Sequence, residues 1–187
     1  MLIDLSIKVT ISANEEAMKN EKMASFGHLG THFDVMNKEF PLSYTRRKGI
    51  VFDVSSVLER DISAEDISLN KIQKDMFVAF YSGFIEKEEY GTKKYFSEHP
   101  QLSDLLVNKL LEKQISIIGI DFAGIRRGKE HTPKDQYCAD NGVFIVENLC
   151  NLNQILQGKK EEYFTANTYP VNFTGMSGLP CRVVGQK

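Results

Sequence analysis

The stretch Gly27-His28-Leu29-Gly30-Thr31-His32-Phe33-Asp34 decides how the chain is interpreted, because it gathers metal-binding side chains at regular spacing. Imidazole and carboxylate groups are ligands that zinc, manganese and iron prefer. On a helix His28 and His32 would share a face, but Asp34 would lie about 200° further round. In an extended chain, positions 28, 30, 32 and 34 point to one side. We therefore predict an extended segment in which both rings and the carboxylate converge on one ion, with Gly30 leaving a notch between the rings.

The composition is that of one globular domain spanning residues 1–187, with 42% hydrophobic and 26% charged residues. The formal net charge of −2, with both signs mixed along the chain, predicts neither a nucleic-acid partner nor an anionic membrane surface. No apolar run approaches the roughly 20 residues of a membrane span, and the first residues lack the pattern of a signal peptide. Three cysteines without C-x-x-C spacing favour a reduced, cytoplasmic compartment.

Hydrophobic periodicity predicts alternating strands and helices. A half-buried strand is expected over 2–10, buried strands over 49–55, 75–82, 115–121 and 143–148, and a strand–turn–strand over 169–184. Helices are expected from the capping box Ser63–Asp66 to about Ile72 and from Ser103 to Lys113, with one helical turn over 151–156. The remaining segments are expected to be polar surface or loop, namely 11–25 (with a short helix as an alternative), 38–48, 86–94 and 122–141.

The apolar face of the second of these helices is expected to consist of Leu102, Leu105, Leu106, Val107, Leu110 and Leu111. The strand over 75–82, this helix and the strand over 115–121 are expected to form a β-α-β crossover. We therefore predict a single α/β domain with a mixed β-sheet and flanking helices.

The stretch from His28 to Asp34 also fits the longer pattern His-x-Gly-Thr-His-x-Asp. This pattern resembles the first metal motif of the cyclase family of metal-dependent hydrolases, which includes kynurenine formamidases and isatin hydrolases. The family form continues with x-Pro-x-His, whereas this chain has Met36 and Lys38 at those two positions. Further segments resemble the family along nearly the whole chain, among them 4–6, 49–55, 143–149 and 178–182.

The resemblance implies a swivelling β/β/α-type fold, a homo-oligomer (dimer or tetramer), and one or two divalent ions, zinc or manganese. It implies His28, His32 and Asp34 as the first ligand set and Glu147 as a later carboxylate that binds metal or acts as a base. Asp135 stands where the family has a further histidine, and His131 is the alternative ligand if the loop bends.

Lys38 stands where a family histidine assists proton transfer, and it is expected to orient or stabilise an anionic intermediate, or to be a solvated surface residue. The leading hypothesis is a metal-dependent hydrolase, related to arylformamidases, in which activated water attacks a cyclic or formylated amide, or a related carbonyl, of a small molecule. The competing hypothesis is a non-catalytic member of the family that binds a metal or a small carboxylate as a sensor or carrier. A third reading makes the histidines purely structural.

Overall fold

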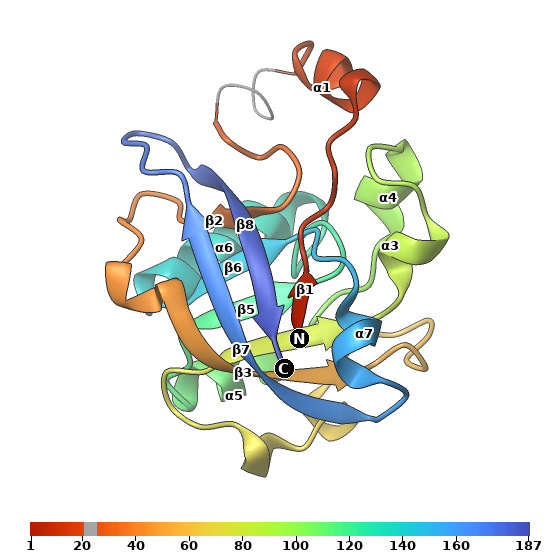
Figure 1. Ribbon diagram of the computed structural model, residues 1–187, viewed down its shortest axis with the longest axis vertical. Coiled ribbons are helices and arrows are strands. Elements are labelled where there is room, and N and C mark those ends of the chain that lie inside the picture. Colours follow the sequence, from red (N-terminus) through yellow and green to blue (C-terminus); the bar gives the residue numbers. More distant parts are fainter. Residues whose placement is uncertain (21–25) are drawn as a thin grey trace.

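The computed structural model describes residues 1–20 and 26–187, and its main feature is one eight-stranded sheet with helices around it (Figure 1). The strands are β1 (Leu2–Asp4), β2 (His32–Asp34), β3 (Arg46–Asp53), β4 (Phe77–Tyr81), β5 (Ile117–Ile120), β6 (Phe144–Glu147), β7 (Glu161–Pro170) and β8 (Gly178–Gln186). The helices are α1 (Ile11–Ala17), α3 (Phe84–Lys87), α4 (Lys93–Glu98), α5 (Asp104–Glu112), α6 (His131–Asp140) and α7 (Leu152–Leu156).

The sheet closes on itself. Its strand order is β1-β8-β2-β6-β5-β4-β3-β7, and β7 also pairs with β8, so that all strands except β1 form a barrel-like ring. The pairs β3–β4, β4–β5 and β5–β6 are parallel, and the other pairs are antiparallel. The predicted α/β domain with a mixed sheet is confirmed, including the β4–α5–β5 crossover.

Two hydrophobic cores occupy the two faces of the parallel strands. On β4, Phe77 and Ala79 belong to one core, whereas Val78 and Phe80 belong to the other, which also contains Leu106 of α5. Side chains alternate along a strand, so a strand buried on both faces has a continuous apolar sequence. This explains why the strands over 75–82, 115–121 and 143–148 could be recognised without any alternation.

Several predicted boundaries are wrong, and local contacts give the reasons. The first strand ends at Asp4 rather than residue 10, because the Asp4 carboxylate accepts a hydrogen bond from the Ser6 N–H at 3.1 Å and turns the chain. The capping box at Ser63 is present, but it opens a 3-10 turn over Ala64–Asp66 and not a helix to Ile72. Ile67 and Leu69 both pack on the core. On a helix, residues two positions apart point about 200° apart, so a helix could not direct both side chains at the core.

Three segments predicted as loops contain regular structure. Residues 38–48 include a 3-10 turn and the start of β3, and residues 86–94 overlap both α3 and α4. The segment 122–141 contains α6, which is a ten-residue helix. The final strand pair is longer than predicted, since β7 begins at Glu161 and not near residue 169.

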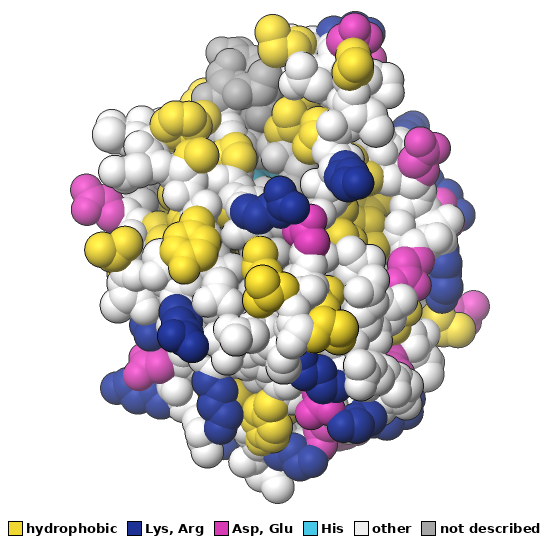
Figure 2. Space-filling view, in the orientation of Figure 1, with side chains coloured by type: hydrophobic (Ala, Val, Ile, Leu, Met, Phe, Trp, Pro, Cys, Tyr) yellow, Lys and Arg dark blue, Asp and Glu magenta, His cyan; other side chains and the backbone are white. Residues whose placement is uncertain are grey.

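The other predictions agree with the structure more closely. The helix after Ser103 and the turn over 151–156 are present as α5 and α7, although Leu105 is exposed rather than part of the apolar face. The polar segment 11–25 begins with α1, and its last five residues lie outside the described part of the chain. Among the described residues, no helix is both long and apolar enough to cross a bilayer. Basic and acidic side chains lie next to one another on the face shown in Figure 2.

Candidate metal centre

The predicted ligands His28, His32 and Asp34 do converge, but not through one extended strand. Only residues 32–34 are in β2, and Gly30 has a φ of +70° that turns the chain between the two histidines. Gly30 therefore does not simply leave a notch: a Cβ there would lie 2.7 Å from a methyl carbon of Val9. The left-handed backbone and the close packing both require glycine at this position.

Three ligand atoms of this segment form a compact triangle. The Nδ1 atom of His28 lies 3.1 Å from Nε2 of His32 and 3.0 Å from Oδ1 of Asp34, and the last two atoms are 3.6 Å apart. Nitrogen and oxygen ligands that share one ion at about 2.0–2.2 Å lie about 3.0–3.6 Å from each other. The donor set therefore fits a divalent ion without rearrangement.

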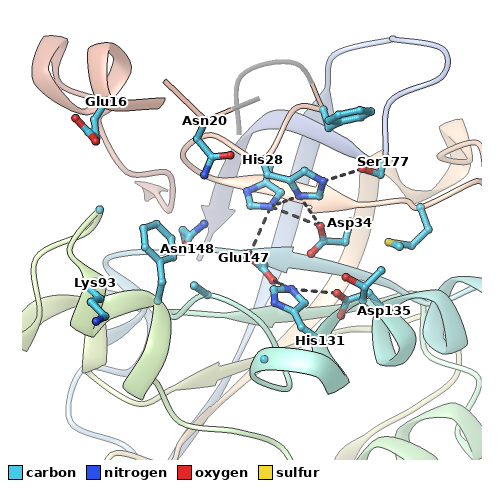
Figure 3. Close-up of a pocket in the computed structure, with 18 residues that line it drawn as sticks. Glu16, Asn20, His28, Asp34, Lys93, His131, Asp135, Glu147, Asn148 and Ser177 are labelled. Carbon is cyan, nitrogen blue, oxygen red and sulfur yellow. Dashed lines mark hydrogen bonds and ion pairs between the residues drawn. The ribbon is translucent and has the colours of Figure 1, made fainter. Parts of the chain in front are cut away.

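Hydrogen bonds behind the rings orient both histidines. Nδ1 of His32 lies 2.9 Å from the Gly30 carbonyl oxygen, so it carries a proton and leaves Nε2 facing Asp34. Nε2 of His28 lies 2.8 Å from the Ser177 hydroxyl, whose oxygen is able to accept a hydrogen bond from the Nε2–H group and so leave the Nδ1 lone pair facing the triangle (Figure 3). Such contacts fix the ring orientation of metal-binding histidines.

Strand register brings Glu147 to the same place. In the antiparallel pair β2–β6, His32 lies directly opposite Glu147, so the two side chains are on one face of the sheet. The Glu147 Oε2 atom is 3.6 Å from Nε2 of His32. The predicted late carboxylate is thus part of the centre.

Helix α6 supplies the rest of the cluster. His131 and Asp135 are four residues apart and share one helix face, with His131 Nε2 3.0 Å from Asp135 Oδ2 and 3.2 Å from Glu147 Oε1 (Figure 3). Asp34, His131 and Asp135 together form a second group whose ligand atoms all lie within 4.8 Å of one another. Asp34 is common to both groups. The structure therefore brings both Asp135 and its alternative, His131, to the centre.

The carboxylates of the centre are almost fully buried: Asp34 and Asp135 are each 2% exposed and Glu147 is 3% exposed. Among the described residues, Asp34 Oδ2 and Asp135 Oδ1 accept no hydrogen bond, and Glu147 Oε1 has only its ion-pair contact with Nε2 of His131 at 3.2 Å. Buried carboxylate oxygens without donors are costly unless a cation or water compensates them. A divalent ion is a compensating group that fits this set of donors.

Electrostatic coupling in the cluster shifts several pKa values. Burial opposes the charge on His32, but Asp34 and Glu147 outweigh it and raise the pKa of His32 to about 9. Burial likewise opposes the charge on His131, and Asp135 and Glu147 raise its pKa to about 11. Burial and the nearby Asp34 raise the pKa of Asp135 to about 7 and also raise that of Glu147.

The cluster forms part of the wall of a pocket of about 890 Å³. Asn20 lines it on the side of α1, and Lys93 and Phe96 line it on the side of α4. Phe26, whose carbonyl accepts a hydrogen bond from the Gly178 N–H, lines it next to β8. Met36 and Thr132 also face the space. This volume is in the range of small-molecule sites, and the buried Asp34, Asp135 and Glu147 line the pocket.

Lys38 is not brought to this pocket. Its ammonium group pairs with Oδ1 of Asp140 at 2.7 Å, at the exposed end of α6. The neighbouring Met36 has a φ of +57°, which a proline cannot adopt. The proline that the family motif has at position 36 is therefore incompatible with the backbone of this chain.

Sequence reasoning missed three residues that support the centre: Ser177, which contacts His28, and Asn148 and Tyr90, which both bind the Gly30 peptide. Asn148 directly follows Glu147, so its position after a predicted ligand was an available signal. The other two come from distant segments without any recognisable pattern.

Comparison with known proteins defines the class. The family model described as "Putative cyclase" matches residues 3–126, more than half of the chain, and the chain belongs to this family. A solved structure described as a potential metal-dependent hydrolase with cyclase activity is 22% identical, with a TM-score of 0.73 and coverage of 99% of this chain and 96% of that one.

Two further solved structures share the fold. A predicted metal-dependent hydrolase from Bacillus stearothermophilus is 21% identical, with a TM-score of 0.71 and coverage of 99% of this chain and 97% of that one. Isatin hydrolase A from Labrenzia aggregata is 16% identical, with a TM-score of 0.74 and coverage of 99% and 93%. No curated protein matches the chain.

Proposed function

We propose that this protein is a metal-dependent hydrolase that cleaves a cyclic or formylated amide, or a related carbonyl compound, of small size. The observation that carries the proposal is the convergence of three imidazoles and three carboxylates, in which buried oxygens of Asp34 and Asp135 lack a donor among the described residues. His28, His32 and Asp34 would hold a divalent ion, zinc or manganese, and Asp34, His131 and Asp135 would hold a second one. A bound ion would supply Lewis-acid chemistry, polarising the carbonyl and lowering the pKa of water from 15.7 towards about 7.

Side chains of the protein would transfer the proton from the attacking water to the leaving group. Glu147 lies against both His32 and His131 and faces the pocket. Its carboxylate would act as the general base and accept the proton that the attacking water loses. The same carboxyl group would then donate this proton to the leaving nitrogen, because the Nε2 atom of His131 that faces it would be bound to the second ion. The bond between the carbonyl carbon and that nitrogen breaks, and the water oxygen remains on the carbon.

The test combines metal content and hydrolysis. Protein purified without a histidine tag is expected to contain one or two equivalents of zinc or manganese and to hydrolyse members of a panel of cyclic and formylated amides. His32→Ala is expected to lose both properties while remaining folded. A wild-type protein that binds no ion after dialysis against zinc or manganese would overturn the proposal. Tight metal binding without turnover would favour the sensor or carrier hypothesis instead.

A further inference from the structure

The peptide group of Gly30 lies between the two histidine ligands and is held by three side chains. Its N–H donates to the Tyr90 hydroxyl at 2.7 Å. Its carbonyl oxygen accepts hydrogen bonds from Nδ1 of His32 and from Nδ2 of Asn148, each at 2.9 Å. The orientation of the His32 ring therefore depends on where this carbonyl is held.

Asn148 is itself fixed at every polar atom. Its side-chain oxygen accepts a hydrogen bond from the Tyr95 hydroxyl at 2.7 Å, and its backbone oxygen accepts one from the Thr31 hydroxyl at 2.8 Å. Its backbone N–H donates to the Phe122 carbonyl at 3.2 Å. Asn148 is 1% exposed and has a φ of +58°, a conformation that asparagine tolerates better than most residues.

Tyr95 connects this network to the wall of the pocket. It is fully buried in α4, while its neighbours Lys93 and Phe96 on the same short helix line the pocket. The hydrogen-bonded path therefore runs from α4 through Tyr95, Asn148 and Gly30 to His32.

We propose that Tyr95 and Asn148 are positioning residues that hold the Gly30 carbonyl against Nδ1 of His32 and thereby keep Nε2 of His32 directed at Asp34 and Glu147. The same contacts fix the α4 wall relative to the centre. The consequence for metal binding rests on the proposed function, whereas the restraint on the ring does not. Neither residue touches a reacting atom in this arrangement, so both act through His32.

Tyr95→Phe is the sharpest variant, because it removes one oxygen atom and keeps the buried ring. Asn148→Asp keeps the size and the acceptor for Tyr95 but replaces the donor to Gly30 by an oxygen. Tyr163→Phe is the matched control, since its hydroxyl donates to the Lys71 carbonyl at 3.3 Å, a contact that involves none of the pocket residues.

Two measurements test the proposal. The dissociation constant for zinc or manganese, measured below the unfolding transition, is expected to rise about tenfold in Tyr95→Phe and more in Asn148→Asp. In metal-free protein labelled with ¹⁵N-histidine, solvent exchange of the His32 ring N–H, assigned by its absence in His32→Gln, is expected to be about tenfold faster in Tyr95→Phe. Tyr163→Phe should change neither quantity.

Unchanged His32 exchange in Tyr95→Phe would overturn the proposal, as would an equal change in Tyr163→Phe. If the wild-type protein binds no ion, the proposed function fails, and the exchange measurement still decides whether Tyr95 and Asn148 restrain His32. If Asn148→Asp does not fold, Tyr95→Phe alone gives the answer.

Discussion

The candidate centre has two halves, which hold their side chains in different ways: the β2 half (His28, His32 and Asp34) and the α6 half (Asp34, His131 and Asp135). In the β2 half, His28 and His32 each make a hydrogen bond behind the ring, to Ser177 and to Gly30. In the α6 half, His131 and Asp135 form an ion pair with each other, and the other side-chain ion pair of His131 within residues 1–20 and 26–187 is with Glu147. The β2 half is thus oriented from outside the centre, whereas the α6 half is held by charges inside it. From this difference we predict that the β2 half determines the position at which an ion binds. We predict that the side chains of the α6 half change their protonation when the positive charge of an ion is present.

The largest effect is expected at Asp34, which belongs to both halves. Asp34→Asn keeps the size of the side chain but removes its charge, so metal affinity is expected to fall by at least about 100-fold, together with hydrolysis. Isothermal titration of metal-free protein measures the affinity. Asp140→Asn is the matched control, because the same change at an exposed ion pair should leave the affinity unchanged. Equal metal affinities for Asp34→Asn and the wild type would show that Asp34 is not shared by two ion-binding groups, and would contradict the division of the centre into two halves.

The pH dependence of stability is expected to separate the metal-free and metal-bound proteins. Because the folded pKa of His32 is about 9 and that of His131 about 11, both above the ordinary 6.5, the metal-free folded state binds more protons than the unfolded state. The free energy of unfolding should therefore fall as pH rises from about 6.5 to 9, by up to about 1.4 kcal/mol per pH unit for His32. A bound ion replaces these protons, so its stabilising effect should grow over the same range.

Thermal unfolding with chelator and with added ion, at several pH values, measures both trends. His131→Gln should flatten the metal-free trend without abolishing it, since His32 remains. A metal-free protein that gains stability between pH 6.5 and 9 would contradict the assigned protonation states.

A smaller effect is expected at Ser177, which tests whether orientation from outside matters in the β2 half. Ser177→Ala removes the partner of His28 Nε2 and should weaken metal binding by about three- to tenfold, because His28 is partly exposed and keeps its contact with Asp34. Competition with a chelating dye measures the change. Ser55→Ala, which removes a contact with Asp53, serves as the control. If Ser177→Ala leaves the metal affinity unchanged, the hydrogen bond behind His28 does not contribute to metal binding, and the proposed difference between the two halves is wrong for His28.

The smallest effect is expected at Lys38, which lies outside both halves. Lys38→Met removes an exposed ion pair with Asp140, and metal affinity should change by less than about twofold. Metal content and hydrolysis rate are measured on the same preparation. A large loss of hydrolysis with full metal content would restore the catalytic role predicted for Lys38 from the family resemblance.

The β2 half could be predicted from the sequence because its ligands are close together in the chain. The spacing of His28, His32 and Asp34 predicted that their side chains converge, as they do, although Gly30 turns the chain where an extended segment was predicted. The strand bearing Glu147 was also recognisable, since buried parallel strands are continuously apolar. The register that places Glu147 opposite His32 joins segments about a hundred residues apart and leaves no local signal.

The α6 half was harder to predict because its helix lacks an apolar stripe. Pro133 was interpreted as a loop residue, but it lies in the first turn of α6, where a proline costs no helical hydrogen bond. Similarly, β7 was missed over 161–168, although Phe164, Ala166 and Thr168 alternate as buried residues along it. Small and polar residues on the inner face concealed that alternation.

The pairing of β2 has a consequence for biosynthesis. This three-residue strand is hydrogen-bonded on one side to β6 and on the other to β8 (Figure 1). In the pairing with β8, Pro180 lies opposite His32. All the proposed ligands precede residue 148, yet the strand that carries two of them is completed only by a segment that leaves the ribosome some thirty residues later. A nascent chain lacking β8 would hold every ligand without an assembled centre. Metal capture should therefore be among the last events in the maturation of this protein.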